Sequence, residues 1–479
     1  MAISQWFANK SYRSDFSSDI RQHMKNIPSK NLKNSFDKIQ TLWLRDEQWD
    51  ILYVGNKIAT GKATNKSLQF DFIHENKSIS DISLDSFMAQ SIDKKLIIDS
   101  FGKKTFESLN SSTTHCEFEI AAISSKESCE KKLYRRLLIP IEIDPVLNIY
   151  YSVKPYTHGE LQNGWSNSLV EVSIQENSFA FYYIKSASQH WLCIDSNSPT
   201  EHKSYWDNAY SILLSHSLLS GQLFLKEGYF LSSENATFEA IDTLEWRQLG
   251  ESKISGYNVI TSNEYSYTKR TNDKNSEPIL KRIDEEIFNR LCSFCQENLY
   301  IRYAINLILS GNLSDGILQP VAYSVALETI TGGLQRNGKK YNLKTVEDSD
   351  WEVVRKDLLT VINSALLEEG PKKIFTTKVN NMNAPLNSTA LSKPFEIAGL
   401  SLSDEDKQLI KKRNGFLHGN LSTPADTIEN QAQYRFFESL RLHFLVCRLI
   451  LKLVDYYGYT IDWSAVVKKK KWEEIHIKI

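Results

Sequence analysis

The 479-residue chain has few cysteines and prolines and no long apolar run. Its six cysteines are too few for a disulfide scaffold at this length, which indicates a reducing compartment. No apolar stretch reaches the roughly 18 residues of a membrane span. The first residues also lack the basic segment and apolar stretch of a secretory signal. These absences predict a cytoplasmic protein that does not contact a membrane.

Neither sign of charge is in excess, because 57 basic and 58 acidic residues leave a net charge of -1. The overall charge therefore does not favour a nucleic-acid binder, and any RNA contact has to be a local basic patch. Hydrophobic residues make up 41% of the chain and charged residues 24%, as is ordinary for globular proteins. The length predicts two or three domains.

Short β-type runs separated by polar turns fill the chain from about residue 45 to residue 267. These runs include 68–72 and 116–120, in which apolar and polar residues alternate, and 179–184. Many such runs in succession predict a β-sandwich or barrel. A helical pattern at about 14–42 precedes them, so residues 1–267 are expected to form one β-rich domain.

The apolar spacing becomes helical after residues 268–280, a polar, charged segment that we interpret as a linker. Helices are expected near 283–294, 299–309, 321–330 and 351–367, and a polar loop over 370–400. The segment 434–457 is apolar on most sides, which predicts a central buried helix or a helix at a subunit interface. The expected fold class is α+β, with a β-rich sandwich or barrel-like domain followed by an all-α bundle over 281–479.

The segment 403–420 carries the strongest chemical signal in the sequence. Ser403, followed by three acidic residues, predicts the N-cap and first turn of a helix. The same helix carries Arg413, Asn414 and His418. Asn414 and His418 lie about 40° apart around a helix, whereas Arg413 and His418 lie about 140° apart. A bend near Gly415 or the length of the side chains has to bring the last two together.

These residue types suit the cleavage of RNA, which carries its own nucleophile in the 2′-hydroxyl. The His418 imidazole can transfer protons near neutral pH, and the Arg413 guanidinium can stabilise charge on the phosphate. One histidine cannot readily act as both acid and base, so two copies related by symmetry would supply two of each group. The expected products have 2′,3′-cyclic phosphate and 5′-hydroxyl ends, and no metal or cofactor is required. An Arg and a His at this spacing also arise by chance.

The run from Arg413 to His418 resembles the signature of HEPN domains (higher eukaryotes and prokaryotes nucleotide-binding). Its surroundings are similar to the ApeA-like branch, in which a β-rich domain precedes the HEPN domain. The resemblance implies a metal-independent endoribonuclease of abortive anti-phage defence that cleaves tRNA or other cellular RNA. It further implies a homodimer or higher even oligomer and an N-terminal domain that responds to a phage-derived trigger. Arg413 and His418 carry over as catalytic residues and Asn414 as their supporting residue.

Other charged residues are candidates for supporting roles. Glu328, an acid within an apolar helical segment, is a candidate partner that fixes Arg413; the alternative is an exposed helix residue. Lys411 and Lys412 adjoin the motif and are candidates for binding the RNA backbone. The lysine run at 468–471 has the same interpretation, against the alternative of a solvated surface.

Two further features have simpler explanations than a site. Cys292 and Cys295 have the spacing of zinc ligands, but no second pair follows, so we expect buried thiols and no metal. The aromatic residues of the β-rich half, such as Trp191 and Trp206, are expected to pack in its core. They leave open an alternative function, a non-enzymatic HEPN dimerisation scaffold with a ligand- or carbohydrate-binding β domain.

Overall fold

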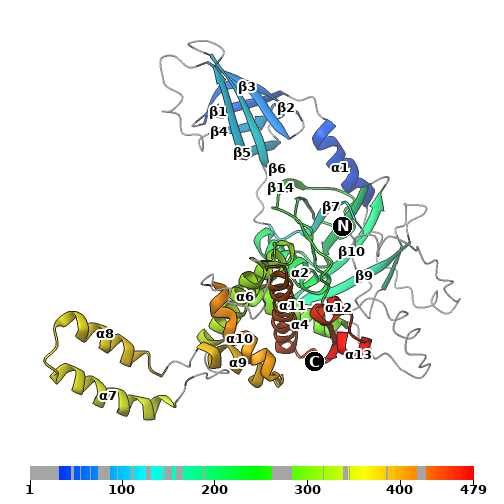
Figure 1. Cartoon of the computed structure of the whole chain (residues 1–479). Helices are drawn as coiled ribbons and strands as arrows, with labels where there is room; N and C mark the ends of the chain where they lie inside the picture. The colour runs from blue at the N-terminus through cyan, green and yellow to red at the C-terminus, as the bar shows by residue number, and fades with distance from the viewer. Residues whose placement is uncertain are drawn as a thin grey trace, which may run out of the picture.

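The computed structural model describes residues 32–44, 48–53, 55–64, 66–73, 87–93, 95–108, 113–125, 131–143, 145, 154–157, 165–186, 189–260, 283–316, 318–337, 344, 346–383, 387–417 and 428–479. Strands dominate as far as residue 260 and helices follow, so the chain has the expected α+β arrangement (Figure 1). The expected linker at 268–280 and the helical segment before residue 32 lie outside these residues.

Six antiparallel strands close into a barrel, drawn in blue to cyan in Figure 1: β1 Gln48–Tyr53, β2 Asn56–Thr64, β3 Ser67–Ile73, β4 Phe87–Ser91, β5 Leu96–Ser108 and β6 Thr113–Ser125. They pair in the order β3-β2-β1-β4-β5-β6, and β6 pairs back with β3. Closure of the barrel pairs the backbone N–H and C=O groups that the edge strands of an open sheet leave unpaired. Alternate residues of β6 point inward, so Cys116, Phe118 and Ile120 are buried. The Phe118 ring meets the ring of Phe70 edge-on.

A second part of the sheet continues from the end of β6, which pairs with β14 Thr243–Gln248. The order then runs β14-β13-β7-β11-β10-β9-β8. These strands are β7 Tyr134–Ile141, β8 Lys154–Thr157, β9 Trp165–Ile174, β10 Asn177–Ser186, β11 Gln189–Ser196 and β13 Glu227–Ser233. Small two-stranded sheets pair β12 Gln222–Leu223 with β15 Lys253–Ile254, and β16 Tyr459–Ile461 with β17 His476–Lys478.

Both faces of this second sheet are covered. Successive residues of β10 enter different apolar cores: Phe179 and Phe181 enter one, and Ala180 and Tyr182 the other. Helix α1 Leu32–Leu44 packs with the second group, since its Phe36 ring lies 5.3 Å from that of Trp191. Helix α2 His202–Ser220 and the C-terminal helices pack with the first group. A strand covered on both faces is apolar throughout, as in β10.

The helical half contains α4 Glu285–Glu297, α5 Leu299–Leu313, α6 Leu318–Arg336, α7 Asp348–Ser364, α8 Glu369–Asn380, α9 Asn387–Ile397, α10 Asp404–Leu417, α11 Ile428–Leu453, α12 Trp463–Val467 and α13 Trp472–Ile475. Helices therefore occupy each segment where apolar spacing predicted one. The long segment near residues 434–457 is α11, whose residues from Leu440 onward are mostly buried, as expected of a central helix.

Two predictions of local structure were wrong. Residues 370–400 contain most of α8 and all of α9, where a polar loop was expected. Residues 202–220 form α2 within a region expected to hold only β structure. Helix α2 is buried along most of its length and has no amphipathic stripe, so its sequence lacks the period that identifies a surface helix.

Among the described helices, none combines the length and hydrophobicity needed to cross a bilayer.

One apolar core joins the second sheet to the helical half. Residues of β7 and β9–β11 share it with α2, α4, α5, α6, α10 and α11. The barrel strands and the opposite face of the second sheet form a separate apolar core. Helix α10, which carries the arginine of the motif, therefore packs against elements that are fixed on the sheet.

Candidate functional site

Helix α10 begins as the sequence predicts. The Ser403 hydroxyl accepts a hydrogen bond from the backbone N–H of Asp406 at 3.1 Å, and the Ser403 N–H donates to the Asp406 carboxylate at 3.2 Å. This reciprocal pair is a capping box, with Asp occupying the position usually held by Glu or Gln. It satisfies two backbone donors at the start of the helix. Asp404, Glu405 and Asp406 fill the first turn, where the helix dipole favours negative charge.

Arg413 lies near the other end of α10 and forms an ion pair with Glu328 of α6, through Nη1 and Oε1. The pair expected from the sequence is therefore present. Arg413 is 3% exposed, whereas the Glu328 side chain is 39% exposed. Burial lowers the pKa of the Arg413 guanidinium, which nevertheless stays charged in proteins. Glu328 supplies the counter-charge that a buried cation requires.

The arginine and the two lysines of the motif segment lie on different sides of α10. Leu409, Ile410 and Phe416, three or four residues from Arg413, are buried in the shared core. Lys411 and Lys412 are exposed. Arg413 therefore lies on the part of the helix that packs inward, whereas the side chains of Lys411 and Lys412 reach solvent.

The remaining motif residues are only partly described. The backbone of Asn414 lies within α10, but its side chain is not among those described. His418 lies outside the described residues, directly after Leu417, the last residue of α10. The juxtaposition of Arg413 with Asn414 and His418 therefore stays a prediction from the sequence.

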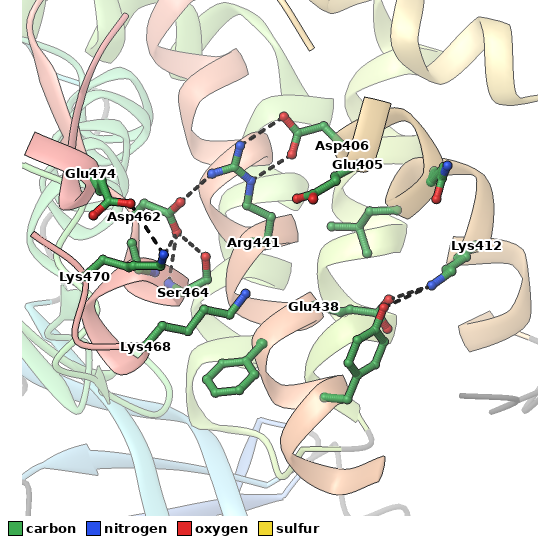
Figure 2. Close-up of a pocket in the computed structure, with 15 residues that line it drawn as sticks. Glu405, Asp406, Lys412, Glu438, Arg441, Asp462, Ser464, Lys468, Lys470 and Glu474 are labelled. Atoms are coloured by element: carbon green, nitrogen blue, oxygen red, sulfur yellow. Dashed lines mark hydrogen bonds and ion pairs between the residues drawn. The ribbon is translucent and has the colours of Figure 1, made fainter. Parts of the chain in front are cut away.

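A pocket of about 620 Å³ lies between α10, α11 and the C-terminal α12–α13 segment (Figure 2). Five acidic and four basic side chains line it: Glu405, Asp406, Glu438, Asp462 and Glu474, with Lys412, Arg441, Lys468 and Lys470. The sequence alone does not reveal this pocket, because its walls come from segments up to 69 residues apart, from position 405 to position 474.

Charge in this pocket is largely compensated. Lys412 Nζ lies 3.1 Å from the Glu438 carboxylate and donates to the Tyr434 hydroxyl at 3.3 Å. Lys470 pairs with Glu474 at 3.5 Å. Lys468 Nζ sits 5.1 Å from the centre of the Phe437 ring, a cation–π contact. The side chains of Lys412, Lys468 and Lys470 are therefore engaged within the chain. The pocket has no surplus positive charge to favour a polyanion.

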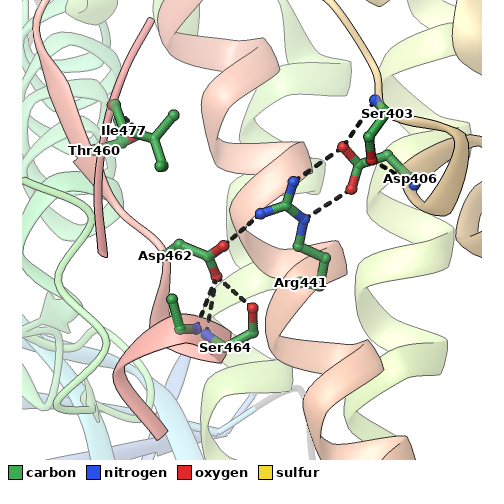
Figure 3. Close-up of polar contacts among 8 residues, drawn as sticks. Ser403, Asp406, Arg441, Thr460, Asp462, Ser464 and Ile477 are labelled. Carbon is green, nitrogen blue, oxygen red and sulfur yellow. Dashed lines mark hydrogen bonds and ion pairs between the residues drawn. The ribbon is translucent and has the colours of Figure 1, made fainter. Parts of the chain in front are cut away.

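Arg441 of α11 links three elements at the edge of the pocket (Figure 3). Its Nε and Nη2 donate to the two Asp406 oxygens at 2.7 and 3.0 Å, and its Nη1 donates to Asp462. The other Asp462 oxygen accepts from the Ser464 N–H at 2.9 Å and hydroxyl at 2.6 Å, which caps α12. Burial alone would raise the pKa of Asp406, but hydrogen bonds and charge from Arg441 outweigh it and lower that pKa.

Other candidate residues have structural roles. Cys292 and Cys295 are buried in α4, as predicted, and burial raises the pKa of Cys295 to about 12. No group of three potential metal ligands occurs among the described residues. In the β-rich half, Trp191 packs on Phe36 and Tyr229, and Trp206 packs on Phe230, so both contribute to packing as expected.

Comparison with known protein families, curated proteins and solved structures found no match to the chain. The resemblance to HEPN domains stays a prediction that rests on residues 413–418.

The Glu328–Arg413 pair can be tested by a double-mutant cycle with Glu328→Gln, Arg413→Met and the double variant. We expect a coupling free energy of about 1 kcal/mol, kept low because the Glu328 side chain is more than a third exposed. Denaturant unfolding measures it. A second cycle, with Lys412→Met in place of Arg413→Met, should be additive. Additivity within about 0.3 kcal/mol in the first cycle would refute the pairing.

Proposed function

We propose that this chain is a cytoplasmic, metal-independent endoribonuclease of the HEPN type that acts in abortive anti-phage defence on tRNA or other cellular RNA. The supporting observation is the buried Arg413 of the motif, held by Glu328 near the end of a capped helix. A buried, paired arginine beside a histidine-bearing segment is the arrangement that a preorganised phosphate site needs. The β-rich region is proposed to sense a phage-derived trigger.

The proposed mechanism uses groups from two copies of the chain. One His418 accepts the proton of the 2′-hydroxyl as its oxygen attacks the adjacent phosphorus. The other His418 protonates the departing 5′-oxygen. Arg413 stabilises the negative charge that grows on the non-bridging oxygens, and Asn414 orients the reacting groups. The products are a 2′,3′-cyclic phosphate and a 5′-hydroxyl.

In the proposed mechanism, a phosphate reaches Arg413 beside the exposed Glu328 side chain. The arginine is almost fully covered, but the carboxylate that it contacts is 39% exposed. The Arg413–Glu328 ion pair therefore lies at the edge of the surface where α6 packs against α10. An RNA phosphate or the second copy can approach the guanidinium from that edge.

A second candidate is a non-enzymatic HEPN dimerisation scaffold with a ligand- or carbohydrate-binding β region. The burial of Arg413 favours it, because a covered ion pair also serves a purely structural purpose. The two candidates differ in whether the intact chain cleaves RNA.

RNA ends sequenced from cells that express the chain, with and without phage infection, test the proposal. New 5′-hydroxyl ends are expected with the wild type and not with His418→Ala. A DNA oligonucleotide with one ribonucleotide should be cut only after that residue, with or without EDTA, because only that residue carries the nucleophile. Cutting of all-DNA strands would contradict the mechanism, and no new ends in either condition would favour the scaffold.

A further inference from the structure

Helices α7 and α8 form an antiparallel hairpin that extends away from the rest of the chain (yellow in Figure 1). Arg355 of α7 donates to the Asn380 side chain at 3.0 Å, which holds the open end of the hairpin together. No residue of α7 is buried, and Val379 is the one buried residue of α8. Two helices alone bury too little apolar surface to be stable in water. Such a hairpin calls for a partner that covers it.

Exposed apolar side chains lie on both helices of the hairpin, with Val353 and Val361 on α7 and Ile374 and Phe375 on α8. Ile374 is 57% exposed and Phe375 46%. Ile374 and Phe375 are about 100° apart around α8, and Phe375 lies one turn before Val379, which packs inward. Exposed apolar residues on an arm of two helices mark an interaction surface.

The charges on this face are arranged for self-pairing. Glu368 lies at the beginning of α8 and Lys378 near its end, and both are exposed on the face of Ile374 and Phe375. Each is five residues from position 373. A two-fold axis through the middle of the helix therefore places Glu368 of one copy opposite Lys378 of the other, on both sides of the apolar centre. Neither side chain has an ion-pair partner within the described part of the chain.

We propose that this α8 face docks on the same face of a second copy of the chain, in an antiparallel, two-fold symmetric α8–α8 contact. A two-fold contact requires a surface that is complementary to itself, which the acidic end, apolar centre and basic end provide. An RNA strand would leave the side chains of Ile374 and Phe375 exposed to water. The contact does not depend on the proposed nuclease function, and it is separate from the pairing of motif helices. If a chain makes both the α8–α8 contact and the pairing of motif helices, the result is an even oligomer larger than a dimer.

Sedimentation of the full-length chain tests the contact. The variant with Ile374→Glu and Phe375→Glu should have about half the mass of the wild type, because four carboxylates would meet at the axis. Val353→Glu is the control, since Val353 is also exposed but lies on α7, outside the proposed contact. Its mass should equal that of the wild type. A monomeric wild type, or an unchanged mass in the α8 variant, would overturn the proposal.

Charge exchange identifies the partner as a second copy. Lys378→Glu or Glu368→Lys alone should weaken association about tenfold, since each places like charges at both ends of the contact. An equimolar mixture of the two single variants should associate like the wild type, as should the double variant. If the single variants associate normally, or the mixture does not recover, the α8–α8 contact is wrong. RNA cleavage is assayed separately on the same samples, so its outcome does not affect this test.

Discussion

Replacing His418 with alanine is expected to lower the rate of RNA cleavage about 10³- to 10⁴-fold without loss of the fold. In the proposed mechanism this change removes the acid and the base together, because both copies lose their imidazole, and general acid–base catalysis contributes on the order of 10²- to 10⁴-fold. Cleavage is measured with purified protein under single-turnover conditions. His115→Ala is the matched control, because His115 pairs with Asp71 at 2.8 Å on the barrel, in a different part of the chain.

Arg413→Lys separates a catalytic arginine from a purely structural one. Lysine keeps the positive charge beside Glu328, so the free energy of unfolding should change little. It lacks the planar fork that holds two phosphate oxygens, so cleavage should fall about 10²-fold. If His418→Ala or Arg413→Lys cleaves RNA at the wild-type rate, the nuclease proposal is wrong. If neither variant nor the wild type cleaves RNA from infected cells, the scaffold function is favoured.

Local sequence patterns were sufficient to predict the start of α10 and the partner of its arginine. Ser403 and Asp406 form hydrogen bonds with backbone groups of the first turn, so the start of α10 is set by local residues. Glu328 could be predicted because an acid within an apolar helix needs a cation, and Arg413 is a buried cation on a neighbouring helix. The β-rich sandwich or barrel could be predicted from strands with alternating apolar residues, such as β6, whose inward-pointing residues are buried.

Features that depend on distant contacts could not be predicted from the sequence. Arg441 finds Asp406 35 positions earlier and Asp462 21 positions later, and nothing local distinguishes it from other arginines of α11. Helix α2 is buried along most of its length because sheet and helices surround it, and its buried residues include polar ones such as Ser215 and His216. In α8, Pro371 lies in the first turn, where proline is compatible with a helix, so it was a poor sign of a loop.

Arg441→Leu is expected to lower the free energy of unfolding by about 3–5 kcal/mol at pH 7, since it leaves the carboxylates of Asp406 and Asp462 buried without their cation. Arg290→Leu is the matched control. Arg290 forms exposed ion pairs with Glu286 and Asp455, so its loss should cost less than about 1 kcal/mol. Urea unfolding measures both variants.

The effect of Arg441→Leu should shrink as the pH falls. In the wild type the folded-state pKa of Asp406 is below its ordinary value of 3.8, so its stabilising contribution is full above that value and is lost as the pH falls through the lowered pKa. In the variant, burial acts without Arg441 and raises the folded-state pKa, so protonation removes the penalty. The triple variant with Asp406→Asn and Asp462→Asn should recover part of the lost stability at pH 7. A pH-independent difference, or one no larger than that of Arg290→Leu, would show that Arg441 does not tie α10 to α11 and α12.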